Sequence, residues 1–162
     1  MTTFQQQVLR EHQFHQAYIK MAVLIAGLSY CSKRKVGALI VKDRNIVAYG
    51  FNGTVNGMEN VCEGADGKTL SNVVHAEMNA ALKAGTECKG ADMYVTLFPC
   101  EPCTKLMAQA GIKRVYYLQE HKVDDRIELY GMTAIKVEVE DELCTCDTPP
   151  FRGFCVVHQV KI

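Results

Sequence analysis

From residue 36 onward, short runs of β-branched and aromatic residues alternate with longer runs whose apolar residues recur at helical spacing. The strand-like runs are the two within 36–53 on either side of residues 43–45, followed by 91–98, 113–118 and 133–140. Helical patterns cover 72–85, 100–111 and 124–131, and a longer one precedes them at 5–29. The resulting β-β-α-β-α-β-α-β order requires helices to cross over the faces of one sheet. We therefore predict an α/β fold with a mixed five-stranded sheet and helices on its faces.

Three further features complete this outline. Asp43, Arg44 and Asn45 separate the first two strand-like runs, which indicates a hairpin. Residues 53–71 are rich in Gly, Asn, Thr and Asp and are predicted to be loop. A chain of 162 residues suits one domain, so we expect a main body at 1–140 with a Cys- and Pro-bearing appendage of the same domain at 141–162.

Overall composition excludes several classes of protein. Apolar residues make up 48% and charged residues 22%, which is typical of a soluble globular protein. The formal net charge is zero, so no nucleic-acid partner is expected. Residues 1–10 lack a signal-peptide pattern, and the apolar run "MAVLIAGL" is too short to span a bilayer. We therefore expect a cytoplasmic protein without a membrane partner, whose eight cysteines are free thiols or metal ligands.

Two predicted helices begin with residues that packing alone does not require. His75 and Glu77 open the 72–85 helix, and Cys100 and Cys103 open the 100–111 helix after Pro99. One imidazole and two thiolates make a zinc site with an open fourth position for water. Both helix N-termini favour negative charge at that site. Glu77 is not needed as a ligand, so we predict that it carries protons between water and substrate.

The segments "HAE" and "PCEPC" together resemble the H-x-E…P-C-x-x-C signature of the zinc-dependent cytidine deaminase superfamily. More specifically, "VGALIV", "GFNG", "HAEMNA" and "LFPCEPCTKLMAQAGIKRVYY" are similar to deoxycytidylate deaminases over about residues 10–140. Phe51 stands where those enzymes carry Tyr in "GYNG". The resemblance implies a three-layer α/β/α cytidine deaminase-like fold, with residues 1–140 as the catalytic domain.

The same resemblance implies the reaction and its control. The expected activity is hydrolytic conversion of dCMP to dUMP and ammonia, which supplies dUMP for thymidylate synthesis. The enzyme would hold one catalytic Zn²⁺ per chain and form a homohexamer. It would be activated by dCTP and inhibited by dTTP, with Mg²⁺ on the effector triphosphate.

Several further residues are candidates for contacts with the substrate. By resemblance, Asn52 hydrogen-bonds the substrate, although it could instead be a turn residue supporting the flanking glycines. Ala76, between His75 and Glu77, is also predicted to contact the substrate. Arg34 and Lys35, in the basic run "SKRK", are candidates for binding a phosphate, against the alternative of a solvated loop.

A second loop is expected to shape the base pocket. In this superfamily the turn after the "RVYYLQE" strand often places an aromatic side chain on the pyrimidine. The candidates here are His121 and Tyr117, although Tyr117 could equally belong to the core and His121 to the surface.

The remaining cysteines leave open whether a second metal is bound. Some phage members of the family bind another zinc through cysteines near Cys31 and Cys62, but with histidines from an insertion that this chain lacks. The C-terminal segment offers a different tetrahedral set. The members of that set are Cys144, Cys146, Cys155 and His158. Plain free thiols are the alternative to both.

Two other functions remain open. The chain could deaminate a different substrate, such as tRNA adenosine, guanine or cytidine, although zero net charge weakens tRNA and the basic loop favours a monophosphate. It could also be a non-catalytic zinc-binding module. Glu77 argues against the module, because a purely structural zinc site has no use for a free carboxylate beside the metal.

Overall fold

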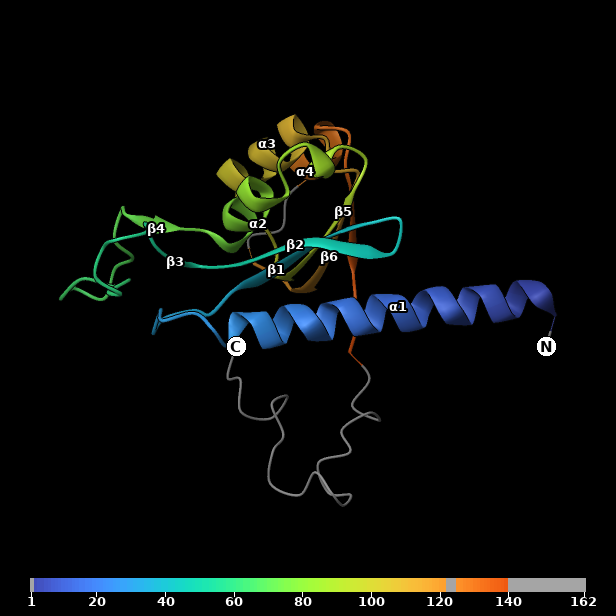
Figure 1. Ribbon diagram of the computed structural model, residues 1–162, viewed down its shortest axis with the longest axis horizontal. Helices are drawn as coiled ribbons and strands as arrows, with labels where there is room; N and C mark the ends of the chain where they lie inside the picture. Colours follow the sequence, from blue (N-terminus) through green and yellow to red (C-terminus); the bar gives the residue numbers. More distant parts are fainter. Residues whose placement is uncertain (1, 122–124, 140–162) are drawn as a thin grey trace, which may run out of the picture.

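The computed structural model describes residues 2–121 and 125–139, and its core is the predicted mixed sheet. The strands are ordered β2-β1-β5-β6-β7 (Figure 1). β1 is antiparallel to both β2 and β5, whereas β5, β6 and β7 run parallel. Their bounds are β1 Gly37–Lys42, β2 Asn45–Phe51, β5 Asp92–Leu97, β6 Arg114–Gln119 and β7 Thr133–Lys136.

Helices cover both faces of this sheet, which gives the expected three layers (Figure 1). α1 (Thr3–Ala26) lies along one face, while α2 (Ala76–Ala84), α3 (Glu101–Ala110) and α4 (Arg126–Leu129) lie on the other. The core is correspondingly split in two. On the α1 side, Tyr18, Ile19 and Ala22 pack against Leu39 and Tyr94. On the other side the buried residues include Ile40, Met93, Val95, Met107 and Val115.

Local sequence signals explain where several elements begin and turn. Thr2 and Gln5 form a capping box at the start of α1. Asp43 and Arg44, between β1 and β2, both have positive φ, as a two-residue hairpin turn with matching strand twist requires. α3 ends at Gly111, which has the left-handed conformation common at helix C-termini.

Two glycines allow the helices to approach the sheet closely. A Cβ on Gly37 of β1 would come within 2.1 Å of the Ala22 carbonyl oxygen of α1. A Cβ on Gly50 of β2 would come within 2.3 Å of the Ala76 oxygen and 2.5 Å of the Ala80 nitrogen of α2. The second contact fixes the start of α2, which carries the candidate catalytic residues, directly against the sheet.

The structure differs from the predicted outline in a few places. The 53–71 loop prediction missed the two-residue strand β3 (Gly53–Thr54), which pairs with β4 (Val73–Val74). Such short strands are specified by their partner rather than by local periodicity. α1 begins at Thr3 and ends at Ala26, rather than spanning 5–29, and α4 is shorter than 124–131. The predicted 72–85 helix begins only at Ala76, because Val73 and Val74 form strand β4. Strand β7 ends at Lys136 rather than at 140.

The appendage at 141–162 lies outside the described residues, so the division at residue 140 stays a prediction. Within the described part of the chain, every helix is too short or too polar to cross a bilayer.

Candidate metal centre and catalytic site

His75 and Cys100 occupy equivalent positions at the starts of two neighbouring helices. Each is the N-cap residue with extended backbone, at φ −73° in both cases, and neither side chain caps its own helix. The imidazole and the thiol are thus left to face each other. Cys103, in the first turn of α3, adds a second sulfur from the same helix. Strand β4 leads directly into His75, and the chain leaves β5 shortly before Cys100.

The distances within this group suit a tetrahedral metal ion. The Sγ atoms of Cys100 and Cys103 lie 3.4 and 3.3 Å from Nδ1 of His75, and all three ligand atoms lie within 4.8 Å of one another. Ideal zinc–sulfur and zinc–nitrogen bonds at tetrahedral angles separate S and N by about 3.6 Å. The residues present therefore fit zinc, with three ligands and one open position. Among residues 2–121 and 125–139, no other His, Cys and carboxylate group has this form.

The electrostatics of the three ligands favour an anionic sulfur before any metal binds. A hydrogen bond from Cys103 and the nearby imidazole lower the pKa of Cys100 to about 4. The thiolate of Cys100 in turn raises the pKa of Cys103, with burial adding to the effect. The hydrogen bond with Cys100 raises the pKa of His75. One thiolate is therefore already formed, as a metal ligand must be.

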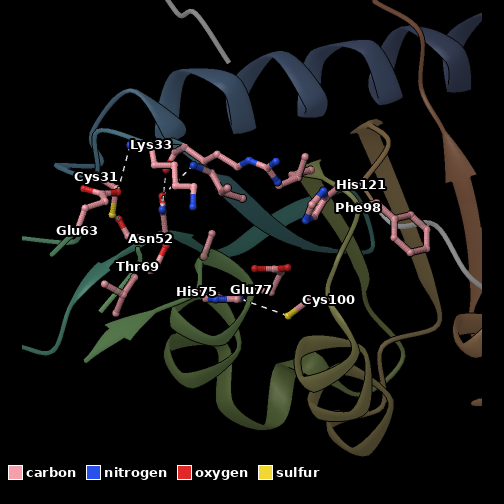
Figure 2. A pocket seen from close by; sticks show the side chains of 15 residues that line it. Cys31, Lys33, Asn52, Glu63, Thr69, His75, Glu77, Phe98, Cys100 and His121 are labelled. Carbon is pink, nitrogen blue, oxygen red and sulfur yellow. Dashed lines mark hydrogen bonds between the residues drawn. The ribbon is translucent and has the colours of Figure 1, made fainter. Parts of the chain in front are cut away.

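Glu77 is a buried carboxyl group beside these ligands. It lies in the first turn of α2 and is only 4% exposed. Burial raises its pKa, because the charged form loses its hydration. Figure 2 shows its side chain next to His75 and Cys100, facing the cavity. A carboxyl group held so close to a metal site, with a pKa moved toward neutrality, suits reversible proton transfer.

The cavity above the ligands has a volume of about 360 Å³, which is enough for one small ligand. Phe98 and His121 lie on one side and Asn52 on another (Figure 2), and Arg34 also lines the cavity. Ala76 lines the cavity as well. The structure thus brings four of the predicted substrate-binding residues to the same space as the metal ligands.

Two other candidates lie elsewhere. Lys35 is outside the lining of the cavity, while its neighbours Lys33 and Arg34 are in it. Tyr117 is buried in the core, with its ring edge-on to Phe98 at 5.0 Å. The core alternative for Tyr117 is therefore the observed one. Phe98 was missed by the sequence reasoning, although an aromatic residue two positions before Cys100 was a signal that could have identified it.

Asn52 uses its side chain to hold the basic loop in place. Its Oδ1 accepts from the Val36 backbone N–H at 2.8 Å, and its Nδ2 donates to the Arg34 carbonyl at 2.8 Å. Its own carbonyl accepts from the Ser29 hydroxyl at 2.7 Å. Asn52 therefore joins both ends of the 29–36 loop to the end of β2. A neighbouring bond, from Nδ2 of Asn79 in α2 to the Phe51 carbonyl, ties the same strand end to the catalytic helix.

The cysteines outside the metal centre behave differently from the free-thiol prediction. Cys31 and Cys62 are joined by a disulfide, so that prediction is wrong for this pair, and neither sulfur is left as a metal ligand. The sequence could not show this pairing, because the two residues are 31 apart and meet only through the fold of two loops. Cys88 is a buried free thiol. Cys144, Cys146, Cys155 and His158 lie outside the described residues.

The fold has three α/β/α layers, and the starts of two helices carry a His-Cys-Cys centre with a glutamate that is not one of its ligands. Together these features define the class of zinc-dependent deaminases. Residues 12–119 match the family "Cytidine and deoxycytidylate deaminase zinc-binding region". The chain belongs to this family.

Individual relatives agree with this assignment. The ComE operon protein 2 of Bacillus subtilis is 36% identical over 139 residues, which is 79% of this chain and 73% of that protein. The deoxycytidylate deaminase of Saccharomyces cerevisiae is 35% identical over 67% of this chain, but the match spans only 38% of the yeast protein. The dCMP deaminase of cyanophage S-TIM5, solved with dCMP and dUMP, matches with a TM-score of 0.69 and 36% identity. That match covers 84% of this chain and 98% of the phage protein.

Proposed function

We propose that this protein is a dCMP deaminase that converts dCMP and water to dUMP and ammonia. The observation that carries the proposal is the buried Glu77 carboxyl beside the three-ligand centre, inside a cavity that also reaches a basic loop. Its similarity to a phage dCMP deaminase over nearly that protein's whole length supports dCMP as the substrate. A purely structural zinc site would need neither the carboxyl nor the cavity.

His75, Cys100 and Cys103 hold the metal in this account. When bound there, zinc supplies Lewis acidity that activates water for attack on C4 of the pyrimidine. The two thiolates and the helix N-termini set the charge of the site, and the buried position of Cys103 keeps the ligand set rigid.

Glu77 moves the protons. As a carboxylate it accepts a proton from the attacking water, and as a carboxylic acid it gives a proton to the pyrimidine ring nitrogen. Glu77 then takes the remaining proton from the hydroxyl group at C4 and gives it to the amino group as the C4–N bond breaks, so that ammonia leaves and a carbonyl remains at C4. A pKa raised by burial suits both directions of transfer.

Side chains around the cavity orient the nucleotide. His121 presents its ring on the side where the base would lie, and base stacking on such a ring is a common mode of recognition, while the buried Phe98 closes that side of the cavity. Arg34, with Lys33 and Lys35 beside it, supplies positive charge for the phosphate. Asn52 orients this loop through its bonds to Arg34 and Val36, and it also lines the cavity that would hold the substrate.

The regulation expected from the family completes the proposal. The enzyme acts in the cytoplasm as a homohexamer and supplies dUMP for thymidylate synthesis. It is activated by dCTP and inhibited by dTTP, with Mg²⁺ on the effector triphosphate. These features rest on the resemblance to deoxycytidylate deaminases.

Ammonia release from zinc-replete protein, assayed with dCMP, cytidine, dCTP and guanine, tests the proposal. We expect dCMP to be the best substrate, with turnover raised by dCTP and lowered by dTTP. Preferential turnover of cytidine or guanine would assign the chain to another branch of the superfamily. Failure to release ammonia from any of the four would favour a non-catalytic zinc module.

A further inference from the structure

Residues 62–70 form a small structural unit within the connection between β3 and β4, and we name it the rim flap. Glu63 and Thr69 pair as an isolated bridge, and the Leu70 N–H donates to the Cys62 carbonyl at 2.8 Å. At its tip the Gly64 N–H donates to the Lys68 carbonyl at 2.9 Å. These bonds connect the two sides of the rim flap to each other.

Two adjacent residues of the rim flap attach it to the 29–36 loop. Cys62 is bonded to Cys31 through the disulfide. The Glu63 carboxylate accepts from the Ser32 backbone N–H at 3.1 Å, the Ser32 hydroxyl at 2.9 Å and the Lys33 backbone N–H at 3.1 Å. These hydrogen bonds, that from the Ser32 backbone above all, lower the pKa of Glu63. One attachment is therefore covalent and the other depends on exposed hydrogen bonds.

The disulfide stands in the wall of the catalytic cavity. Cys31, Glu63 and Thr69 line that cavity, and Figure 2 shows Cys31 and Glu63 on the side away from Cys100. Cys62 and Glu63 also line a second hollow outside, together with Tyr30 and Gly64. The Cys31–Cys62 bond and the Glu63 contacts thus separate the catalytic cavity from the outer hollow.

The two sides of the disulfide are anchored unequally. On the Cys31 side, the Ser29 hydroxyl donates to Asn52 and accepts from the Cys31 backbone N–H at 3.2 Å. Asn52 holds Arg34 and Val36 as well. None of these bonds involves a sulfur atom, so we expect all of them to remain when the disulfide is broken. On the Cys62 side, once the disulfide is broken, the hydrogen bonds of the Glu63 carboxylate are the remaining contact at the cavity wall. The rim flap is therefore the segment that becomes more mobile.

We propose that Cys31 and Cys62 form a redox-controlled clasp that closes the wall of the catalytic cavity. In its oxidised form the clasp holds the rim flap in place and keeps the cavity ready for substrate. In its reduced form the rim flap opens more often, and substrate binding weakens because part of the wall is lost. The activity component of this inference rests on the proposed function, whereas the opening of the flap does not.

The clasp closes by thiol–disulfide exchange with a small-molecule disulfide such as oxidised glutathione. One cysteine thiolate attacks that disulfide, forms a mixed disulfide and releases one glutathione thiolate. The second cysteine thiolate attacks the cysteine sulfur of the mixed disulfide, forms the Cys31–Cys62 bond and releases the other. Two protein thiols are oxidised, and one molecule of disulfide is reduced to two thiols that take up the two protons. Because both sulfurs are buried, exchange occurs during local opening of the rim flap.

Limited proteolysis of the full-length, zinc-replete protein tests the opening without any substrate. Lys68, in the rim flap, has a highly exposed side chain and is a natural trypsin site. We expect cleavage after Lys68 to be roughly tenfold faster in protein reduced with a phosphine than in protein oxidised with glutathione disulfide. Cleavage after Arg34 should change little, because Asn52 holds that loop in both states. Mass spectrometry of the fragments distinguishes the two sites.

Variants assign the effect to this pair of cysteines. In Cys62→Ser and Cys31→Ser, cleavage after Lys68 should be fast and indifferent to redox conditions. Cys88→Ser, which removes a buried thiol remote from the cavity, should keep the response of the wild type. The wild-type comparison stands by itself if a serine variant does not fold.

Two results would overturn the proposal. The first is equal cleavage after Lys68 in oxidised and reduced wild type, and the second is a redox response that persists in Cys62→Ser. In the activity assay, reduction should raise the KM for dCMP several-fold and leave kcat nearly unchanged. A protein that does not turn over dCMP but still shows redox-dependent cleavage would refute the proposed substrate and leave the clasp intact.

Discussion

At the scale of single residues, sequence reasoning identified the chemical groups but not their supporting contacts. His75, Glu77, Cys100 and Cys103 carry a signature that is local in the chain, and the structure brings their side chains together. Glu63 carries no such signature. Its carboxylate meets the Ser32 and Lys33 backbone only because two loops converge in space. Supporting contacts of this kind depend on tertiary structure and could not be read from spacing.

Asn52 offers a test of such a supporting contact. Asn52→Ala removes two part-buried hydrogen bonds to the backbone of Arg34 and Val36, so we expect a loss of about 1–3 kcal/mol in the free energy of unfolding. The KM for dCMP should rise too, because the basic loop loses its position. The matched control is Asn45→Ala at the exposed start of β2, which should change stability by less than about 0.5 kcal/mol. Urea unfolding and initial rates measure both effects, and equal behaviour of the two variants would refute the assigned role.

His15 gives a prediction on pH. It is a partly buried residue of α1, where its Nδ1 lies 2.8 Å from the Tyr94 hydroxyl and its ring stacks on Tyr116. Burial lowers its pKa below 6.5, opposed by Glu11 and Asp92 and assisted by Arg114 and His12. Below pH 6.5 the unfolded chain therefore binds more protons at this position than the folded protein does. This contribution to stability is present above pH 6.5 and is lost as the pH falls through the lower, folded-state pKa.

Urea unfolding of wild type and His15→Gln between pH 7.5 and 5.5 measures that contribution. We expect stability to fall less steeply with acidification in His15→Gln than in wild type. If His15→Gln follows the wild-type slope, the ring is not held in its neutral form.

At the scale of elements, periodicity and turn signals predicted every strand of the main sheet and every long helix. The hairpin at Asp43 and Arg44 and the C-cap at Gly111 are local signals, and both lie where expected. The β3–β4 pair was missed because each strand has two residues and is defined by its partner. The ends of α1 and α4 were misplaced for a related reason, since apolar spacing indicates a face of a helix more sharply than its termini.

The contact between β2 and α2 can be tested through Gly50. A methyl group at this position meets the backbone of Ala76 and Ala80, so α2 must move away from the sheet. We expect Gly50→Ala to lower the free energy of unfolding by about 1–3 kcal/mol. The kcat should fall as well, because α2 carries Glu77 and begins at His75. Gly53→Ala is the matched control. Gly53 lies two residues after the end of β2, and a Cβ at this position meets no atom within 4 Å.

Thermal unfolding and steady-state rates of Gly50→Ala and Gly53→Ala measure the effects on stability and on kcat. If Gly50→Ala and Gly53→Ala proved equally active and stable, close packing of β2 against α2 would not be what positions the catalytic residues.

At the scale of the whole molecule, the metal centre joins two helices that the sequence separates. His75 begins α2 and Cys100 begins α3, so a shared ion connects the starts of both to one another and to the sheet edge. This arrangement was predictable because each half of the ligand set opens a recognisable helix. The Cys31–Cys62 bond was not predictable, since no local pattern indicates which of eight cysteines pair.

Removal of zinc should therefore destabilise the whole domain. At a free zinc concentration one hundred times its Kd, binding contributes about 2.7 kcal/mol of stability. That corresponds to roughly 5–10 °C in Tm for a domain of this size. Differential scanning calorimetry of chelated and zinc-reconstituted protein measures the difference. Cys103→Ser should lose this response, whereas Cys88→Ser should retain it. Coincident melting curves with and without zinc would contradict a structural contribution from the ion.

The most direct measurement of the central claim is ammonia release from dCMP by wild type and Glu77→Gln at matched zinc content. Because general acid–base transfer contributes on the order of 10²–10⁴ in rate, the account predicts a loss of that size in Glu77→Gln with zinc retained. Wild-type turnover in a zinc-loaded Glu77→Gln variant, or no release of ammonia from dCMP by zinc-replete wild type, would contradict it.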